Sequence, residues 1–400
     1  MSYSKNLVTN LPCFVLVIAI SDSWICQKGS IMKKLLVIPH ETSRTGAPLL
    51  LLSILRRLRN CQDIETRLLL AQGGPLTDEF CELFPSLMGG NPETEAEIEE
   101  WLNWPDLIFT NSVPSHDLLK GRILRVPVLS NVLELDNNLL ADRVRLHGAP
   151  IQKFVVASEA VRSNLVKNHG IDQTDTTICY GFAPDPSIPD LSREQICRQL
   201  DIPTDSYIVG SVGTLMRYKG PDIFVEVCKE ITELSAVLGK SVHFAWIGGH
   251  SSYAGLPLKR MERSEQIALV AAAGLDASFH YIGEVINARQ YISAFDVFVS
   301  AAREDPFPTV VLEAACERVP IVCFDAGGAK EFVENDGGIV IPAFDARAMA
   351  QAVITLLADS SLRARMVDKA AERVESEFNA DKRIAAFIEA IDKELSSQVK

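Results

Sequence analysis

The sequence lacks the features that mark a metal centre, a disulfide scaffold, a nucleic-acid binder or a membrane span. Its nine cysteines include no Cys-x-x-Cys pair, and this odd number in a long chain fits apolar side chains in a reducing compartment. Basic residues are in deficit, since 39 Lys and Arg stand against 52 Asp and Glu, a net charge of −13 that repels polyanions. The longest apolar run, Leu11–Ile20, has half of the roughly 20 residues that cross a bilayer. We therefore expect a cytoplasmic protein without a nucleic-acid partner.

The length and composition favour a folded protein with more than one domain. At roughly 100 to 200 residues per domain, 400 residues suggest two or three, and 47% apolar against 23% charged residues is typical of a globular chain. Met32 marks the start of the folded part, because the strand-like segment Lys33–Pro39 follows it directly. No small-residue cleavage site follows the run Leu11–Ile20, so we treat residues 1–31 as an extension outside the fold.

From residue 34 onward, short apolar runs alternate with longer helical stretches, a pattern typical of α/β folds. Two groups of six runs are expected to form strands. The first group is Leu35–Pro39, Arg67–Ala71, Leu107–Thr110, Arg125–Ser130, Phe154–Ser158 and Thr177–Gly181. The second group is Ile208–Val212, Val242–Ile247, Phe279–Ile282, Val297–Ser300, Ile321–Phe324 and Ile339–Ile341. We predict two doubly wound, Rossmann-like domains that face each other across a cleft.

A proline-rich segment, Ala183–Ile188, separates the two groups of runs and indicates the domain boundary. We place an N-terminal domain at residues 32–188 and a C-terminal domain at residues 189–380. The last segment, residues 381–400, has apolar side chains at helical spacing, namely Ile384, Phe387, Ile388 and Ile391. It should form an amphipathic helix that packs back on the N-terminal domain.

The loop and helix after the run Val297–Ser300 hold the most informative residues, because ligands of such sheets bind at the carboxyl ends of strands. Pro308 suits the first position of a helix, and the free amides of Thr309 and Val310 would then attract a phosphate. Glu313 follows among apolar neighbours, and a buried carboxylate needs a partner. A backbone group or a lysine would serve, and so would the vicinal hydroxyls of a ligand.

Two further loops follow predicted strands. One contains Arg217 and Lys219, and an arginine that binds bidentately beside a lysine that acts as a point charge suits a diphosphate. In the other, Gly46 stands in a Thr-Gly-Ala-Pro turn, where a glycine permits close approach to the backbone. His40 and Glu41 precede this turn, but no second histidine completes a His-Glu-x-x-His zinc site, so no metal centre is expected.

These loops resemble motifs of a known enzyme family. Seven residues separate Asp305 from Glu313, and this Asp-x-Phe-Pro-x-x-x-x-Glu segment is similar to the acidic-x7-Glu motif of retaining glycosyltransferases of the GT-B fold, family 4 (glycosyl transferases group 1). The segment from Gly213 to Gly220 is similar to the Gly-x-Leu-x-x-x-Lys-Gly loop of that family, with Lys219 on its lysine. The resemblance extends from about residue 33 to the carboxyl end.

The resemblance implies an enzyme that moves a hexose-type sugar from a nucleotide-diphosphate sugar to an acceptor hydroxyl, with retention and without a metal or another cofactor. The N-terminal domain would hold the acceptor and the C-terminal domain the donor. Among the catalytic residues so implied, Lys219 and Arg217 would neutralise the leaving diphosphate. Asp305 would hold sugar hydroxyls and Glu313 the ribose hydroxyls. The other donor-binding residues implied are Gly46, Gly213, Gly283, Glu284, Phe307, Pro308 and Thr309.

The implied partners are a nucleotide sugar and a glycan or lipid-linked glycan acceptor in polysaccharide or glycoconjugate synthesis. A lipid-linked acceptor would bring the protein into peripheral contact with the inner face of a membrane. Four residues depart from the family pattern, since Asp305, Thr214, Asn131 and Arg318 stand where a glutamate, an arginine, a histidine and a glycine are common. A non-catalytic nucleotide-sugar or glycan-binding module and a GT-B sugar-nucleotide epimerase stay open as alternatives. A nicotinamide dehydrogenase is disfavoured, because no Gly-x-Gly-x-x-Gly turn is complete.

Overall fold

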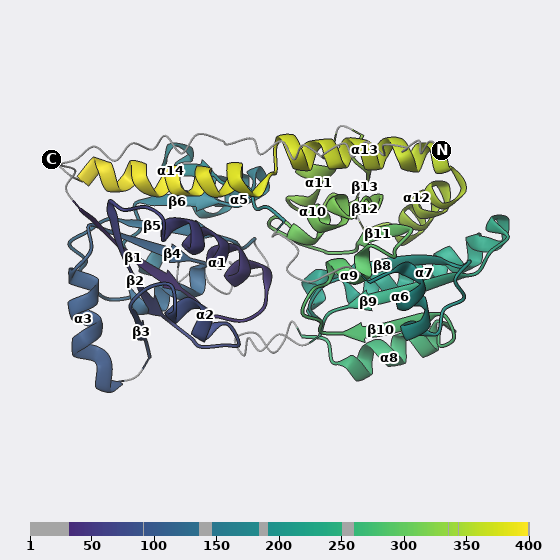
Figure 1. The fold of residues 1–400 in the computed structure, drawn as a ribbon, viewed down its shortest axis with the longest axis horizontal. Coiled ribbons are helices and arrows are strands. Elements are labelled where there is room, and N and C mark those ends of the chain that lie inside the picture. The colour runs from purple at the N-terminus through teal and green to yellow at the C-terminus, as the bar shows by residue number, and fades with distance from the viewer. Residues whose placement is uncertain are drawn as a thin grey trace, which may run out of the picture.

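The chain forms two α/β domains, which lie side by side in Figure 1. The computed structural model describes residues 32–90, 92–135, 146–183, 191–249, 260–334, 336–342 and 344–398. The extension predicted at residues 1–31 and the domain boundary predicted at residue 188 lie outside the described residues.

The first domain is built on a seven-stranded parallel sheet with the order β3-β2-β1-β4-β5-β6-β7. The strands are β1 (Lys33–Pro39), β2 (Ile64–Leu70), β3 (Ser86–Met88), β4 (Leu107–Asn111), β5 (Val128–Val132), β6 (Lys153–Val156) and β7 (Thr176–Ile178). The sequence predicts all of them except β3. This edge strand has three residues, of which only Leu87 is buried, and so short a segment carries no alternating pattern.

The second domain is built on a six-stranded parallel sheet with the order β10-β9-β8-β11-β12-β13. The strands are β8 (Tyr207–Val212), β9 (Val242–Ile247), β10 (Phe279–Gly283), β11 (Val297–Ser300), β12 (Ile321–Phe324) and β13 (Ile339–Ile341). Each corresponds to a predicted run, and β11 and β12, which are buried along their whole length, read as continuous apolar segments. The predicted α/β fold with two doubly wound sheets is therefore confirmed.

Helices connect the strands and cover both sheets. In the first domain they are α1 (Gly46–Leu58), α2 (Thr77–Cys81), α3 (Glu95–Asn103) and α5 (Glu159–His169). In the second they are α6 (Arg193–Leu200), α7 (Pro221–Leu234), α8 (Arg263–Ala272), α9 (Arg289–Ile292), α10 (Thr309–Cys316), α11 (Ala329–Val333), α12 (Ala346–Ala358) and α13 (Ser360–Ser376). Among the helices of the described ranges, none combines the length and the apolar character needed to cross a bilayer.

The last helix, α14 (Ala380–Gln398), lies against the first domain although it follows the second in the chain (Figure 1). Phe387, Ile391 and Leu395 are fully buried in one apolar cluster with residues of α1 and of the first sheet. Lys33 at the start of β1 also donates to Asp392 at 2.5 Å. The chain thus crosses between the domains a second time, and α14 completes the core of the first.

We expect the variant Ile391→Val to lower the free energy of unfolding by about 0.5–1.5 kcal/mol, because it deletes one buried methylene from that cluster. The measurement is the urea midpoint of the full chain. The matched control is Ile388→Val on the same helix, whose side chain is only partly buried. Equal effects of the two variants would contradict the packing of α14 through Ile391.

The topology brings one edge of each sheet to a common cleft. The strand order reverses between β1 and β4 in the first sheet and between β8 and β11 in the second. Ligands of parallel sheets bind at such switch points, outside the carboxyl ends of the strands. The two points face each other, since a methyl group built on Gly46, after β1, would lie 3.7 Å from Thr309 Oγ1, after β11.

Candidate functional site

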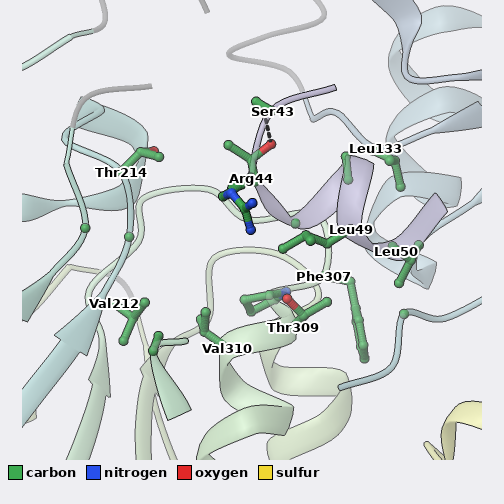
Figure 2. Close-up of a pocket in the computed structure, with 18 of the residues that line it drawn as sticks. Ser43, Arg44, Leu49, Leu50, Leu133, Val212, Thr214, Phe307, Thr309 and Val310 are labelled. Carbon is green, nitrogen blue, oxygen red and sulfur yellow. Dashed lines mark hydrogen bonds between the residues drawn. The ribbon is translucent and has the colours of Figure 1, made fainter. Parts of the chain in front are cut away.

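A cavity of about 680 Å³ lies between the domains at these two switch points. Its walls are the loops after β1, β8, β10 and β11, together with the starts of α1 and α10. Figure 2 shows Arg44 in the middle of this space, with Thr309 and Val310 of α10 below it as drawn and Thr214 to its left. Pockets of roughly 300–1,000 Å³ hold small ligands, so the cavity is large enough for one.

A buried ion pair stands in the wall formed by the second domain. Lys219 Nζ donates to Asp305 Oδ2 at 2.5 Å, and the side chains are 24% and 7% exposed. Burial alone would lower the pKa of Lys219, but the charges of Asp305 and Tyr218 and the hydrogen bond to Asp305 together outweigh burial and raise that pKa, so the lysine is protonated. Gly220 lets the two loops pack this closely, because its φ is 68° and a side chain there would lie 1.9 Å from Ala301 O.

The positive end of α10 opens into the cavity beside this pair. Pro308 occupies the N-cap position, one residue before the helical position that the sequence predicts, because its ψ of 108° is extended. It makes no side-chain cap, so the amides of Thr309 and Val310, which both line the cavity, lack intrahelical acceptors. These amides and the helix dipole favour an anionic group, as the sequence predicts.

Glu313 lies about one turn further along α10 and also lines the cavity. Burial raises the pKa of this carboxyl to about 7, an effect that Arg289 opposes and Glu317 reinforces. Within the described part of the chain, no hydrogen bond to its oxygens is found, and Arg289, which lowers its pKa, forms an ion pair with Glu317 at 2.6 Å. Neither a lysine nor a backbone group satisfies Glu313 there, so a ligand group is the partner that the geometry favours.

Most of the predicted site residues meet in the cavity. Its lining includes Gly46, Gly213, Lys219, Glu284, Asp305, Phe307, Pro308, Thr309 and Glu313. Arg217 and Gly283 are not part of it. The Arg217 side chain is 48% exposed and donates to Glu265 at 3.2 Å, away from Lys219. Gly283 ends β10 with a φ of 82° and delivers Glu284 to the wall. Asn131 lies in β5, where its amide donates to Asn111 Oδ1 at 2.8 Å.

The wall formed by the first domain also contains a group of polar residues that the sequence does not predict as a site. Glu134 Oε2 accepts from Leu133 N at 2.8 Å, and Oε1 accepts from Val113 N at 3.1 Å and from the Ser112 hydroxyl. His40 and Glu41 lie beside it, 9% and 6% exposed. A signal was available for Glu134, a carboxylate two residues beyond the carboxyl end of β5, the strand next to the switch point, but no spacing motif includes it.

The described residues contain neither a cluster suited to a metal ion nor a disulfide. Within the described ranges, no group of three or more His, Cys, Asp or Glu side chains is placed to hold a metal ion. The cysteines of those ranges are free, and four of them, Cys179, Cys197, Cys228 and Cys323, are buried. They contribute apolar volume to the cores, as the sequence predicts.

Comparisons of sequence find similarity to glycosyltransferases in the second domain. Residues 192–373 match the model of the family described as glycosyl transferases group 1. The lipopolysaccharide core biosynthesis glycosyltransferase LpsE of Rhizobium meliloti is 24% identical over 194 residues, 48% of this chain and 52% of that protein. The lipopolysaccharide core biosynthesis mannosyltransferase LpsB of the same species is 27% identical over 192 residues, 47% of this chain and 52% of that protein. The chain thus spans about half the length of the curated relatives it matches.

Comparisons of structure cover both domains. The crystal structure of Anabaena HepE in complex with UDP-glucose matches with a TM-score of 0.75 and 19% identity, over 90% of this chain and 99% of that one. The crystal structure of WaaG, a glycosyltransferase involved in lipopolysaccharide biosynthesis, matches with a TM-score of 0.67 and 14% identity, over 88% of this chain and 99% of that one. The predicted GT-B fold is confirmed. The residues that match the glycosyl transferases group 1 model include Lys219, Asp305 and Glu313.

Proposed function

We propose that this protein is a retaining, metal-independent glycosyltransferase of family 4 that moves a hexose-type sugar from a nucleotide-diphosphate sugar to an acceptor hydroxyl. The observation that carries the proposal is the cavity wall in which Lys219, the start of α10 and Glu313 stand together. A protonated lysine and free helix amides suit a diphosphate, and an unpartnered carboxylate suits a ribose diol. The group 1 match covers the same wall.

In the proposed reaction, the bond between the anomeric carbon and the diphosphate oxygen breaks, and its electron pair leaves with the diphosphate. The acceptor oxygen bonds to the same face of the anomeric carbon and gives its proton to the departing phosphate oxygen. Lys219 and the amides of Thr309 and Val310 stabilise the negative charge that develops on the leaving group. Asp305 holds hydroxyls of the sugar and keeps Lys219 in place. Retention rests on the resemblance of the segment Asp305–Glu313 to the acidic-x7-Glu motif.

The acceptor side of the proposal lies in the first domain. The buried carboxylates Glu41 and Glu134 line that wall and favour a hydroxylated acceptor, such as a glycan or a lipid-linked glycan. Relatives named for lipopolysaccharide core synthesis and for teichuronic acid biosynthesis support a role in polysaccharide or glycoconjugate synthesis. We propose a cytoplasmic location, with peripheral contact to the inner face of a membrane where the acceptor is lipid-linked.

The test is calorimetric titration of the full chain with UDP, GDP and their hexose conjugates in EDTA, followed by donor hydrolysis. Binding with slow hydrolysis in EDTA supports a metal-independent transferase and identifies its donor. Binding without turnover in the presence of a panel of glycan acceptors would favour a non-catalytic nucleotide-sugar module. Release of the free sugar with an altered configuration would favour an epimerase.

The affinity for the nucleotide should depend on pH through Glu313. With a pKa of about 7, this carboxyl is roughly 10% ionised at pH 6 and 90% at pH 8. Only the carboxylate accepts from both ribose hydroxyls, so the dissociation constant should tighten about tenfold between these pH values. In Glu313→Gln, binding should be weaker and flat over the same window. The 2′,3′-dideoxy nucleotide is the control, since it should bind the unaltered protein without this dependence. An equal dependence for both nucleotides would contradict the ribose contact.

A further inference from the structure

The cavity contains one cation that no carboxylate of the described residues neutralises. Four arginine and lysine side chains line it: Arg44, Arg56, Lys219 and Arg289. Lys219 is paired with Asp305 at 2.5 Å, Arg289 with Glu317 at 2.6 Å and Arg56 with Glu79 at 2.7 Å. Arg44 is exposed to the cavity, and among the described residues no carboxylate lies within ion-pair distance of its guanidinium.

The backbone that carries Arg44 is held firmly, although the side chain is exposed. Ser43 Oγ donates to Glu41 Oε1 at 2.8 Å and lies 2.9 Å from Thr45 Oγ1. Thr42 O accepts from Leu76 N at 2.9 Å, and Thr42 itself is fully buried. The loop backbone is therefore already ordered in the free protein, so that on binding only the Arg44 side chain loses conformational freedom.

Arg44 also faces two helix N-termini. It stands directly before Thr45, the N-cap of α1, and the start of α1 lies opposite Thr309, the first residue of α10. Figure 2 shows its side chain directed into the space above the start of α10. A guanidinium and two positive helix ends around one gap repel one another unless an anion lies between them.

The second domain does not supply the positive charge that would compensate a bound diphosphate. Lys219 and Asp305 together are neutral, and Arg217 points to Glu265 outside the lining. A nucleoside diphosphate brings more than one negative charge, which exceeds what the helix amides and an already paired lysine compensate. The missing positive charge has to come from the opposite wall.

On the basis of the proposed function, we propose that Arg44 is a donor-binding residue that crosses the cleft from the first domain and holds the diphosphate of the nucleotide sugar. Its planar guanidinium binds phosphate oxygens bidentately, opposite the amides of Thr309 and Val310. The wall of the second domain alone then does not complete the diphosphate site. Both domains must be in place before the diphosphate is fully compensated.

The experiment titrates the full chain and the variants Arg44→Ala and Arg44→Lys with UDP, GDP, UMP and inorganic pyrophosphate. Arg44→Ala should bind the nucleoside diphosphate and pyrophosphate about 10- to 100-fold more weakly, with a smaller loss for UMP. Arg44→Lys should recover only part of the affinity, because a lysine cannot bind bidentately. Arg57→Ala is the matched control, since Arg57 is exposed on α1, the helix that follows Arg44, and lies outside the cavity lining.

The outcomes separate this inference from the proposed function. Unchanged affinity of Arg44→Ala for pyrophosphate and for the nucleotides that the parent chain binds would overturn it. A loss of affinity in Arg217→Ala without a loss in Arg44→Ala would also overturn the inference. The same holds if Arg44→Ala weakens only the binding of a phosphorylated acceptor such as glycerol phosphate. If pyrophosphate binding depends on Arg44 while no nucleotide diphosphate binds, the proposed function fails and the anion site stands. The urea midpoint of each variant is measured to establish that affinities are compared between folded proteins.

Discussion

Replacing Lys219 with alanine is expected to lower kcat by about 10²- to 10³-fold, with a smaller change in the KM for the donor. The reason is that Lys219 is protonated and lines the cavity beside the proposed position of the leaving diphosphate, where negative charge would grow as the reaction proceeds. An interaction that strengthens in the transition state appears in kcat rather than in ground-state binding. The measurement is steady-state transfer or donor hydrolysis with the donor identified by titration.

The same variant should also lower the free energy of unfolding, which complicates its interpretation. Asp305 is 7% exposed, and without Lys219 it is a buried carboxylate with no cation, which costs about 3–5 kcal/mol. The double variant Lys219→Ala/Asp305→Asn removes that charge and should recover most of the stability but not the rate. Recovery of the rate together with the stability would show that Lys219 only supports the fold. The pair would then have no part in stabilising the leaving group.

The fold was accessible from the sequence because each strand and its following helix are local patterns. Runs such as Val297–Ser300 are apolar throughout, since both faces of a central parallel strand are covered. The end of α10 was accessible for the same reason. Arg318, which stands where a glycine is common in the family that the sequence resembles, adopts a φ of 58°, a left-handed conformation that costs a non-glycine residue about 1 kcal/mol. The strand β3 was not accessible, because three residues carry no period.

The candidate site could be predicted from the sequence only where its residues are also close together in the sequence. Asp305, Thr309 and Glu313 lie within one loop and helix, so their spacing in the sequence is nearly their spacing in space. Arg217 and Lys219 are neighbours in the sequence, but they lie on one turn of 3₁₀ helix, where residues two apart point in different directions. Arg44 was not accessible, because its role depends on which of the other cations are already paired. That pairing is set by contacts between distant segments.

The contact that holds the two domains in register was equally invisible in the sequence. Glu331 in α11 of the second domain accepts from Glu159 N at 2.9 Å and from Ala160 N at 2.8 Å, the first amides of α5 in the first domain. It also accepts from the Tyr180 hydroxyl at 2.9 Å. A carboxylate from one domain thus caps a helix of the other. Next to it, Ser158 Oγ donates to Pro306 O at 2.6 Å, which ties α5 to the loop that presents Asp305.

Replacing Glu331 with alanine is expected to lower the free energy of unfolding by about 2–5 kcal/mol and to increase the radius of gyration measured by small-angle scattering. Three charge-assisted hydrogen bonds are lost at once, and the start of α5 loses the negative charge that complements its dipole. Burial and then Glu331 raise the pKa of Tyr180 to about 12, so the variant should also lower this pKa in an ultraviolet titration. Glu334→Ala is the matched control, because its side chain is exposed just after α11. If both variants behave alike in stability, size and tyrosine titration, Glu331 does not hold the two domains together. The proposed contact of Arg44 with the diphosphate would then not depend on Glu331.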